Sequence, residues 1–171
     1  MKRIAVDMDG VLADVYEQFF RWDERDFGKR RPLEEVIGVE ERKAFPYIND
    51  YVYAKGFFRT APVVKDSFEI LKKINENYEV FIVSAAMEFP QSLPEKLEWL
   101  NEHFHFLTWH QLVFCGSKKI IEADIMIDDH FKNLDLFAGT TILYTQPHNQ
   151  VSDAGRHKRA DSWLEIASIL L

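Results

Sequence analysis

The sequence predicts an α/β fold: a Rossmann-like three-layer core with a mainly parallel five-stranded sheet, and a small helical cap inserted after the first strand. Three observations support this prediction. Short apolar segments of β character alternate with segments whose apolar residues recur at helical spacing, which is typical of parallel sheets with right-handed crossovers. The length of 171 residues fits one core with a modest insertion, and 47% of the residues are hydrophobic. Residues 15–59 lack the period-two alternation of strands.

The first strand is predicted at residues 4–6, a short apolar run that ends at Asp7. Such a run is typical of a strand buried on both faces of a parallel sheet. Asp7 and Asp9 would then lie at the carboxyl edge of the sheet, where open α/β proteins bind ligands. Two carboxylates this close repel each other unless a cation or a proton lies between them. The alternative is a solvated turn in which Asp caps the next helix.

Residues 15–59 are predicted to form the helical cap. A helix is expected over residues 15–27, where aromatic residues recur among charges until Gly28 breaks the pattern. The basic residues 29–31 are interpreted as a solvated turn, because three consecutive cations cannot all face one pocket. Shorter helices are predicted at residues 33–37, 40–45 and about 48–55.

Residues 60–171 are predicted to alternate between helices and strands, and to form the catalytic core together with residues 1–14. Helices are predicted at residues 63–77, 93–103, 131–137 and 162–171, and strands at residues 78–83, 112–115, 125–127 and 141–144. Residues 145–160 are predicted to be a surface loop, because they contain two histidines, a glycine and several polar residues.

Polar side chains recur where successive predicted strands end: Asp7 and Asp9, then Ser84, then Asp128 and Asp129. The carboxyl ends of parallel strands share one edge of the sheet, so these residues are expected to converge on one crevice. Paired carboxylates, a hydroxyl and a bound Mg²⁺ suit phosphoryl transfer, because Mg²⁺ prefers one or two carboxylates together with substrate phosphate oxygens. A polar turn is the alternative for each position taken alone.

The run at residues 7–14, Asp-Met-Asp-Gly-Val-Leu-Ala-Asp, resembles the first motif of the haloacid dehalogenase superfamily of phosphatases. In particular it is similar to that of the 5'(3')-deoxyribonucleotidases. The resemblance implies that Asp7 is the nucleophile that attacks phosphorus and that Asp9 is the general acid and base.

The later motifs of that family have counterparts in order along nearly the whole chain. The resemblance implies that Ser84 binds a phosphate oxygen, that Lys118 balances the charge of the transferring group, and that Asp128 completes a Mg²⁺ site with Asp7 and Asp9. Lys119 is a rival of Lys118 on chemistry alone, but Lys118 has the spacing of the family, ten residues before the fourth motif. Asp129 is expected to contact the metal ligands without binding the metal itself.

Nucleotide specificity rests on positions at which the chain departs from the mammalian enzymes. Those enzymes carry an aromatic residue directly after the first motif and a second hydroxyl in the second motif, whereas this chain has Val15 and Ala85 there, with Tyr16 next to Val15. The family places aromatic residues near the end of the cap, so Phe57 and Phe58 could stack on a nucleobase. Core packing is the alternative, because it accounts for most Phe residues.

Charge and cysteine content exclude several other classes of protein. The formal net charge of −7 disfavours non-specific binding to nucleic-acid polymers and to anionic membranes. Cys115 is the only cysteine, so no intrachain disulfide can form and a reducing compartment is expected. No secretory signal or membrane-spanning run occurs in the sequence, which predicts a cytoplasmic location. A homodimer is one assembly that the sequence leaves open.

The sequence therefore predicts a Mg²⁺-dependent phosphatase that forms an aspartyl-phosphate on Asp7. The resemblance implies a deoxyribonucleoside 5'- or 3'-monophosphate as substrate, with a pyrimidine base favoured over a purine. Two alternatives stay open: a phosphatase for sugar phosphates or other small phosphomonoesters, and a non-catalytic nucleotide-binding protein with the same fold.

Overall fold

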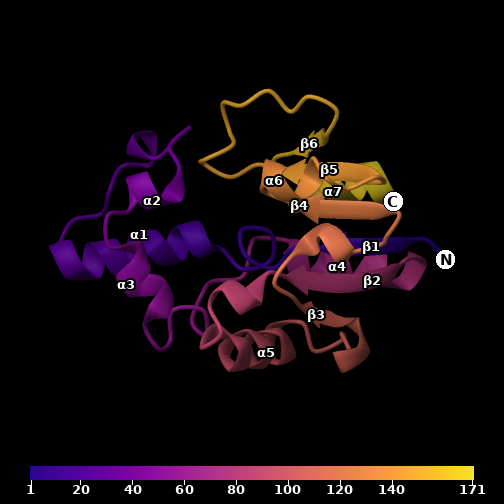
Figure 1. Ribbon diagram of the computed structural model, residues 1–171, viewed down its shortest axis with the longest axis horizontal. Helices are drawn as coiled ribbons and strands as arrows, with labels where there is room; N and C mark the ends of the chain where they lie inside the picture. Colours follow the sequence, from indigo (N-terminus) through magenta and orange to yellow (C-terminus); the bar gives the residue numbers. More distant parts are fainter.

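The computed structural model describes residues 1–171, and its centre is one sheet of six parallel strands (Figure 1). The strands are β1 (Arg3–Val6), β2 (Glu79–Ser84), β3 (Leu112–Phe114), β4 (Ile125–Asp128), β5 (Thr140–Tyr144) and β6 (Lys158–Ala160). Their order in the sheet is β3-β2-β1-β4-β5-β6. From β1 the chain first adds strands on one side and then on the other, so a crevice opens at the carboxyl ends of β1 and its neighbours.

The prediction of a parallel α/β sheet is confirmed, but the count of five strands is wrong. The sixth strand, β6, pairs with β5 in parallel, with Leu143 opposite Arg159. It consists of Lys-Arg-Ala, and only Ala160 is fully buried. Because β6 is a short edge strand with one buried residue, it lacks the apolar run by which the other strands were recognised.

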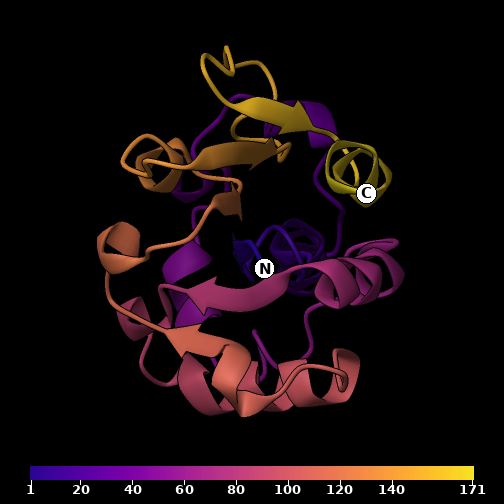
Figure 2. The ribbon, with the colours of Figure 1, turned by 90° about the vertical axis from the view of Figure 1, so that its right-hand side faces the viewer.

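The sheet packs against apolar layers on both of its faces. Ile4 and Val6 of β1 belong to one buried cluster, and Ala5 belongs to another on the opposite face. The first cluster is covered by α4 (Ser67–Asn77), α5 (Ser92–His103) and α7 (Trp163–Leu170), and the second by α6 (Phe131–Leu134). Figure 2 shows α4 and α7 on one side of the strands and α6 on the other. These layers form the three-layer core that was predicted.

Helices between β1 and α4 form a separate group with a hydrophobic cluster of its own (Figure 1). They are α1 (Val15–Phe27), η1 (Leu33–Glu35), α2 (Glu41–Ala44) and α3 (Ile48–Tyr53). Helix α1 has the predicted bounds because Asp14 Oδ1 accepts a hydrogen bond from the Glu17 amide at 2.9 Å, and Gly28 ends the helix at φ +71°. The assignment of residues 15–59 to a cap stays a prediction about domain organisation.

One predicted helix starts later in the structure than in the prediction. Helix α4 starts at Ser67 rather than residue 63, because the Asp14 amide donates to the Pro62 carbonyl and the Val64 amide to the Leu12 carbonyl. Those bonds hold residues 62–64 against the loop that follows β1. The short 3₁₀ helices are η2 (Ala86–Glu88), η3 (Trp109–Gln111) and η4 (Lys118–Ile120).

The predicted surface loop at residues 145–160 is largely tied to the core. Asn149 is 1% exposed, and its Nδ2 donates to the carbonyls of Asp129 at 2.8 Å and Tyr144 at 2.9 Å. Arg159 donates to Asn149 Oδ1 at 3.1 Å. The polar residues of this segment therefore satisfy buried backbone groups, which composition alone does not distinguish from solvation. Of all the helices, none combines the length and the apolar content of a membrane span.

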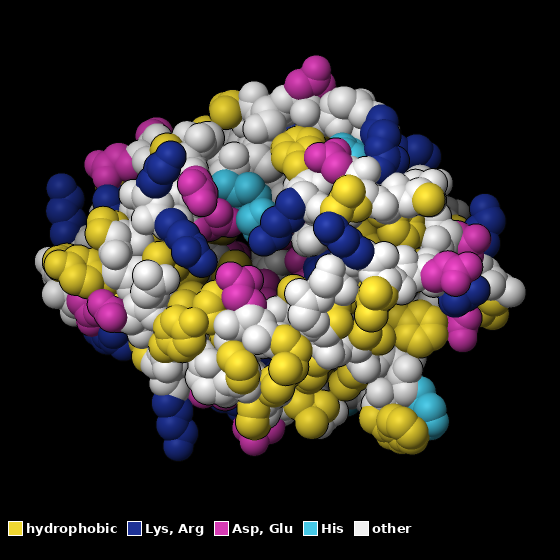
Figure 3. All heavy atoms as spheres, viewed as in Figure 1, with side chains coloured by type: hydrophobic (Ala, Val, Ile, Leu, Met, Phe, Trp, Pro, Cys, Tyr) yellow, Lys and Arg dark blue, Asp and Glu magenta, His cyan; other side chains and the backbone are white.

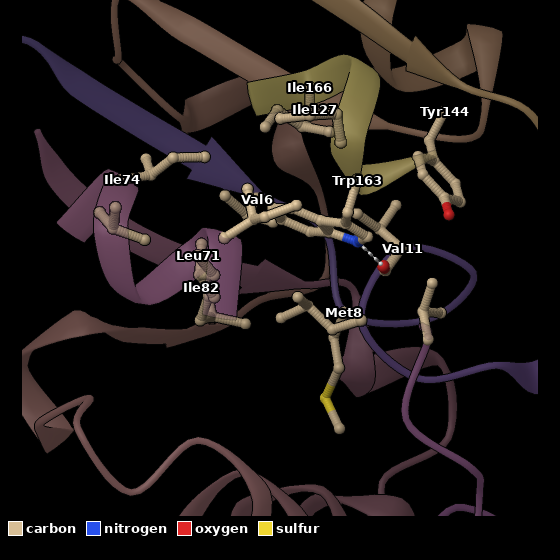
Figure 4. Packing of buried hydrophobic residues seen from close by; sticks show 14 of the residues in the cluster. Val6, Met8, Val11, Leu71, Ile74, Ile82, Ile127, Tyr144, Trp163 and Ile166 are labelled. Atoms are coloured by element: carbon tan, nitrogen blue, oxygen red, sulfur yellow. Dashed lines mark hydrogen bonds between the residues drawn. The ribbon is translucent and has the colours of Figure 1, made fainter. Parts of the chain in front are cut away.

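A hydrogen bond from helix α7 fixes the loop that follows β1. Trp163 is fully buried, and its indole Nε1 donates to the Val11 carbonyl at 2.8 Å (Figure 4). Met8, Val11 and Leu12 are also fully buried, so the backbone on either side of Asp9 and Gly10 is held by the core.

Replacing Trp163 with Phe is expected to lower the free energy of unfolding by about 1–3 kcal/mol, because the buried Val11 carbonyl loses its donor. Chemical denaturation followed by circular dichroism measures the change. Trp109→Phe is the matched control, because the Trp109 side chain is 75% exposed. Equal stability of the two variants would contradict the role given to the indole hydrogen bond.

Candidate active site

The loop that follows β1 presents two carboxylates at the carboxyl edge of the sheet. The Asp7 amide donates to the Ile127 carbonyl of β4 at 2.9 Å, and the chain then turns at Gly10, where φ is +79°. A Cβ at Gly10 would lie 2.5 Å from Asp129 Oδ2. Only glycine therefore allows both this turn and the close approach of Asp129 to the loop.

One lysine joins the carboxylates of two strands. Lys118 Nζ lies 2.7 Å from Asp7 Oδ1 and 2.6 Å from Asp128 Oδ2, and all three side chains are buried. Asp128 Oδ1 also accepts from the His130 amide at 2.9 Å, and Asn133 Nδ2 lies 3.0 Å from both of its oxygens. The structure thus brings Asp7, Lys118 and Asp128 together, whereas Lys119 is exposed.

The acidic groups outnumber the lysine, which raises their proton affinity. Burial raises the pKa of Asp7 to about 8, Lys118 opposes this, and Asp128 and Asp129 add to it. Burial also raises the pKa of Asp129, against the effect of His130. Burial lowers the pKa of Lys118, but Asp7 and Asp128 more than offset it, so the net shift is upward. The site therefore attracts a further cation.

The oxygen atoms around Asp7 fit a hard divalent cation. Asp7, Asp128 and Asp129 each place a carboxylate oxygen within 4.8 Å of the others. Asp129 Oδ1 is buried and has no hydrogen-bond partner, and the same is true of Asp9 Oδ1. An all-oxygen set with unpartnered carboxylate atoms matches the preference of Mg²⁺. The sequence predicts that Asp9 binds the metal together with Asp7 and Asp128, and this stays a prediction. In the structure, Asp129 is a further carboxylate close to Asp7 and Asp128.

Asp9 instead faces a lysine that the sequence analysis missed. Lys96 of α5 is 1% exposed, and its Nζ forms an ion pair with Asp9 Oδ2 and lies 3.2 Å from Ser84 Oγ. The same ammonium lies 4.4 Å from the centre of the Phe58 ring. Lys96 shares the buried face of its helix with Ser92, Trp99 and Leu100. A lysine at an apolar position of a helix was the signal available in the sequence.

A cavity of about 580 Å³ lies between helices α1, α2 and α3 and the carboxyl edge of the sheet. Asp7, Asp9, Lys96 and Lys118 lie along its floor, and Ala85 lines it after Ser84. Figure 3 shows a hollow on this face, bordered by acidic, basic and histidine side chains. The cavity is within the size range of small-molecule sites.

The aromatic residues predicted to bind substrate line this cavity but are deeply packed. Phe57 is fully buried and lies against Phe19 and Trp22, with ring centres 5.0 and 5.2 Å apart. Phe58 is 5% exposed and stands beside Lys96. Val15, which follows the first motif directly, also lines the cavity. Stacking of Phe57 or Phe58 on a base stays a prediction.

Two histidines and a glutamate, His130, His148 and Glu41, also line the cavity. Burial lowers the pKa of His130, but Asp129 and Glu41 more than offset it and raise the value to about 10. For Glu41, burial raises the pKa, but His130 and His148 more than offset it and lower the value to about 2. Burial and the neighbouring His130 lower the pKa of His148.

Comparisons with known proteins agree on one family. A family model described as "5' nucleotidase, deoxy (Pyrimidine), cytosolic type C protein" matches residues 1–171. Two proteins named 5'(3')-deoxyribonucleotidase, from Bacillus subtilis strain 168 and from Bacillus phage SPbeta, are each 38% identical to this chain over 173 residues. Each match covers 99% of this chain and 99% of the relative.

Solved structures share the fold at low sequence identity. A haloacid dehalogenase-like hydrolase from Streptococcus pneumoniae superposes with a TM-score of 0.67 and 14% identity, covering 100% of this chain and 99% of that one. A haloacid dehalogenase-family hydrolase from Bacillus subtilis, solved bound to magnesium, gives a TM-score of 0.62 and 13% identity, covering 99% and 98%. These likenesses support the architecture of the core.

The raised pKa of Asp7 predicts a pH-dependent loss of stability in protein freed of divalent ions. The folded state keeps the Asp7 proton up to about pH 8, whereas an ordinary Asp releases it near 3.8. The stability that this group contributes is therefore present below that lower value and is lost as the pH rises towards 8. In EDTA, the Tm of the wild type is expected to fall relative to that of Asp7→Asn between about pH 5 and pH 8.

Thermal melts of both proteins across this range provide the measurement. Asp50→Asn is the control, because Asp50 is exposed, and it should follow the wild type. A difference in Tm between wild type and Asp7→Asn that stays constant with pH would show that Asp7 is not the buried titrating group.

Proposed function

Because this chain belongs to the 5'(3')-deoxyribonucleotidase family of haloacid dehalogenase-like phosphatases, we propose that it hydrolyses deoxyribonucleoside 5'- and 3'-monophosphates with Mg²⁺ and an aspartyl-phosphate intermediate. The observation that carries the proposal is that Lys118 joins Asp7 to the fully buried Asp128, and that Asp7 and Lys118 line a cavity of about 580 Å³. Sequence identity to the named relatives extends over the whole chain.

In the first step, Asp7 attacks phosphorus. Both interactions of its carboxylate are made by Oδ1. This oxygen accepts a hydrogen bond from the Met8 amide at 2.7 Å and forms an ion pair with Lys118. Oδ2 is therefore the free nucleophile. A bond forms between Oδ2 and phosphorus, the bond to the ester oxygen breaks, and Lys118 stabilises charge on the phosphoryl oxygens. Ser84, the buried last residue of β2, is proposed to donate to one of them.

In the same step, Asp9 gives a proton to the departing nucleoside oxygen. It then takes a proton from the water that attacks phosphorus, the bond between phosphorus and Asp7 breaks, and inorganic phosphate leaves. The two carboxylates therefore share the work: Asp7 forms the covalent bond, and Asp9 moves one proton out and one proton in.

Mg²⁺ is proposed at Asp7, Asp9 and Asp128, as the sequence implies, with the Asp129 carboxylate as a further ligand close to Asp7 and Asp128. When bound, it would offset the repulsion between the Asp7 carboxylate and the phosphate dianion. The unpartnered Asp129 Oδ1 supports this assignment, and so does the magnesium in the related Bacillus subtilis hydrolase.

Lys96 is proposed to position Asp9. Its ammonium contacts both Asp9 Oδ2 and Ser84 Oγ, so it fixes the acid next to the phosphate-binding hydroxyl. With Oδ2 held by the lysine, the unpartnered Oδ1 of Asp9 is the oxygen left to exchange protons.

The helices over residues 15–59 are proposed to act as the cap that encloses the nucleoside. Residues Val15, Phe57 and Phe58 of this segment supply apolar surface to the cavity. A pyrimidine base is proposed over a purine because the description of the matching family model names pyrimidine. A cytoplasmic location, a homodimer and the absence of nucleic-acid polymers as partners stay predictions from the sequence.

Assays on a panel of monophosphates test the proposed substrate and mechanism together. Wild-type protein with Mg²⁺ is expected to release phosphate faster from deoxynucleotides than from ribonucleotides or sugar phosphates. EDTA should stop the reaction, and added Mg²⁺ should restore it. Asp7→Asn should lose essentially all turnover with its circular dichroism unchanged, because the covalent step has no nucleophile.

Each alternative has its own outcome in these assays. Faster hydrolysis of sugar phosphates would move the enzyme to the second substrate class. Nucleotide binding without phosphate release would favour a non-catalytic protein. Turnover retained in Asp7→Asn would refute the covalent route.

Replacing Lys96 with Met is expected to lower kcat on deoxynucleotides by about 100-fold with a smaller change in KM, because Asp9 loses its fixed orientation. The loss should shrink with p-nitrophenyl phosphate, whose leaving group needs little protonation, and Lys96→Arg should recover part of it. Lys119→Met is the control, because Lys119 is exposed. An equal loss on both substrates would point to damaged structure instead of a misplaced acid.

A further inference from the structure

One wall of the cavity holds three side chains with the donor atoms of a transition-metal site. We call Glu41, His130 and His148 the cap–core cluster. Glu41 is the first residue of α2, His130 follows β4, and His148 lies in the segment after β5. Glu41 Oε1 is 3.3 Å from His130 Nε2 and 3.2 Å from His148 Nδ1. All three residues line the cavity.

The hydrogen bonds of His148 fix which nitrogen is free to bind a ligand. Its Nε2 lies 3.0 Å from the Asp129 carbonyl, which can only accept, so Nε2 carries the hydrogen. The neutral ring then presents the lone pair of Nδ1 to Glu41 Oε1. Tyr16 OH, at 3.1 Å, is the one donor beside that lone pair. A backbone carbonyl that fixes the tautomer of a histidine is a common outer partner in metal sites.

The spacing of the cluster fits a small tetrahedral ion. Ligand atoms bound at about 2.0–2.1 Å in a tetrahedron lie about 3.3 Å apart, which is close to both distances from Glu41. Asp129 Oδ2 adds negative charge, at 3.8 Å from His130 Nε2 and 3.9 Å from His148 Nε2. The negative charge of the carboxylates around the histidines would therefore favour the binding of a divalent cation.

The two imidazole rings must turn before both can bind one ion. They are stacked, with centres 4.4 Å apart and planes at 16°, whereas a shared ion has to lie in both planes. Rotation about the bond between Cβ and Cγ has a broad minimum in histidine, so this adjustment costs little. His130 is free to make it, because its side chain is 33% exposed.

From this geometry we propose that the cap–core cluster binds a borderline divalent metal such as Zn²⁺ at a site distinct from that of Mg²⁺. Two imidazole nitrogens and one carboxylate suit Zn²⁺, whereas Mg²⁺ requires oxygen ligands. The ion joins α2 of the cap to the ends of β4 and β5. Its fourth position faces the cavity, where water or a polar atom of the substrate completes the coordination.

Visible spectroscopy with Co²⁺ as the probe tests the proposal independently of catalysis. Full-length protein in excess Mg²⁺, which occupies the oxygen site, is titrated with Co²⁺. The wild type is expected to give the intense bands of a four-coordinate nitrogen and oxygen site, and Zn²⁺ should remove them. Glu41→Gln and His148→Ala should each weaken Co²⁺ affinity by more than about 100-fold, since loss of even an outer partner of a ligand costs about 10–100-fold.

Matched controls separate the cluster from general binding to acidic or histidine side chains. Glu40→Gln and His110→Ala alter exposed residues of the same types and should keep the bands. Circular dichroism confirms that each variant is folded, and the nearly isosteric Glu41→Gln guards against a folding defect in His148→Ala. A wild type without these bands, or bands that persist in both cluster variants, would overturn the proposal.

Discussion

Mutual repulsion of buried carboxylates is the constraint around which this molecule is arranged. Asp7, Asp128 and Asp129 meet at the ends of two adjacent strands, and Lys118 is the one ammonium between the first two. The core contributes the rest of the compensation through the Asn133 amide and the His130 backbone, which both donate to Asp128. Burying this excess of negative charge costs free energy, and the packing of the surrounding hydrophobic core offsets that cost.

That core explains why the carboxylates hold their positions. Met8, Val11 and Leu12 are fully buried on either side of Asp9 and Gly10, so the loop that carries the site is anchored in the core. Gly10 then brings Asp129 closer than any side chain at that position would allow. Rigidity of this kind serves phosphoryl transfer, in which most of the catalytic effect comes from groups already aimed at the developing charge.

The features that could be predicted from the sequence are those that recur along the chain and those that follow from the parallel direction of the strands. Five apolar runs predicted five of the strands, and parallel pairing then predicted that the residues after β1, β2 and β4 would converge. Features that depend on a single tertiary contact were not predictable. The edge strand β6 has one buried residue, and Asn149 is buried because it bonds to the carbonyls of Asp129 and Tyr144.

Lys96 is a residue of the site whose role could not be predicted from the sequence. Its position on the apolar face of α5 was visible in the sequence, but the ion pair with Asp9 joins residues 87 positions apart. The grouping of Asp129 with Asp7 and Asp128 has the same origin, because it requires the approach that Gly10 permits. The assignment of roles to Asp7, Asp9, Ser84 and Lys118 came from the resemblance to a family and from chemistry.

The indole of Trp163 links the beginning of the chain to its end. The donor that fixes the Val11 carbonyl belongs to α7, 152 positions further along the chain. A local opening of α7 would therefore leave this buried carbonyl without its partner. The order of the loop that carries Asp7 and Asp9 depends in this way on the docking of a helix distant from it in the sequence.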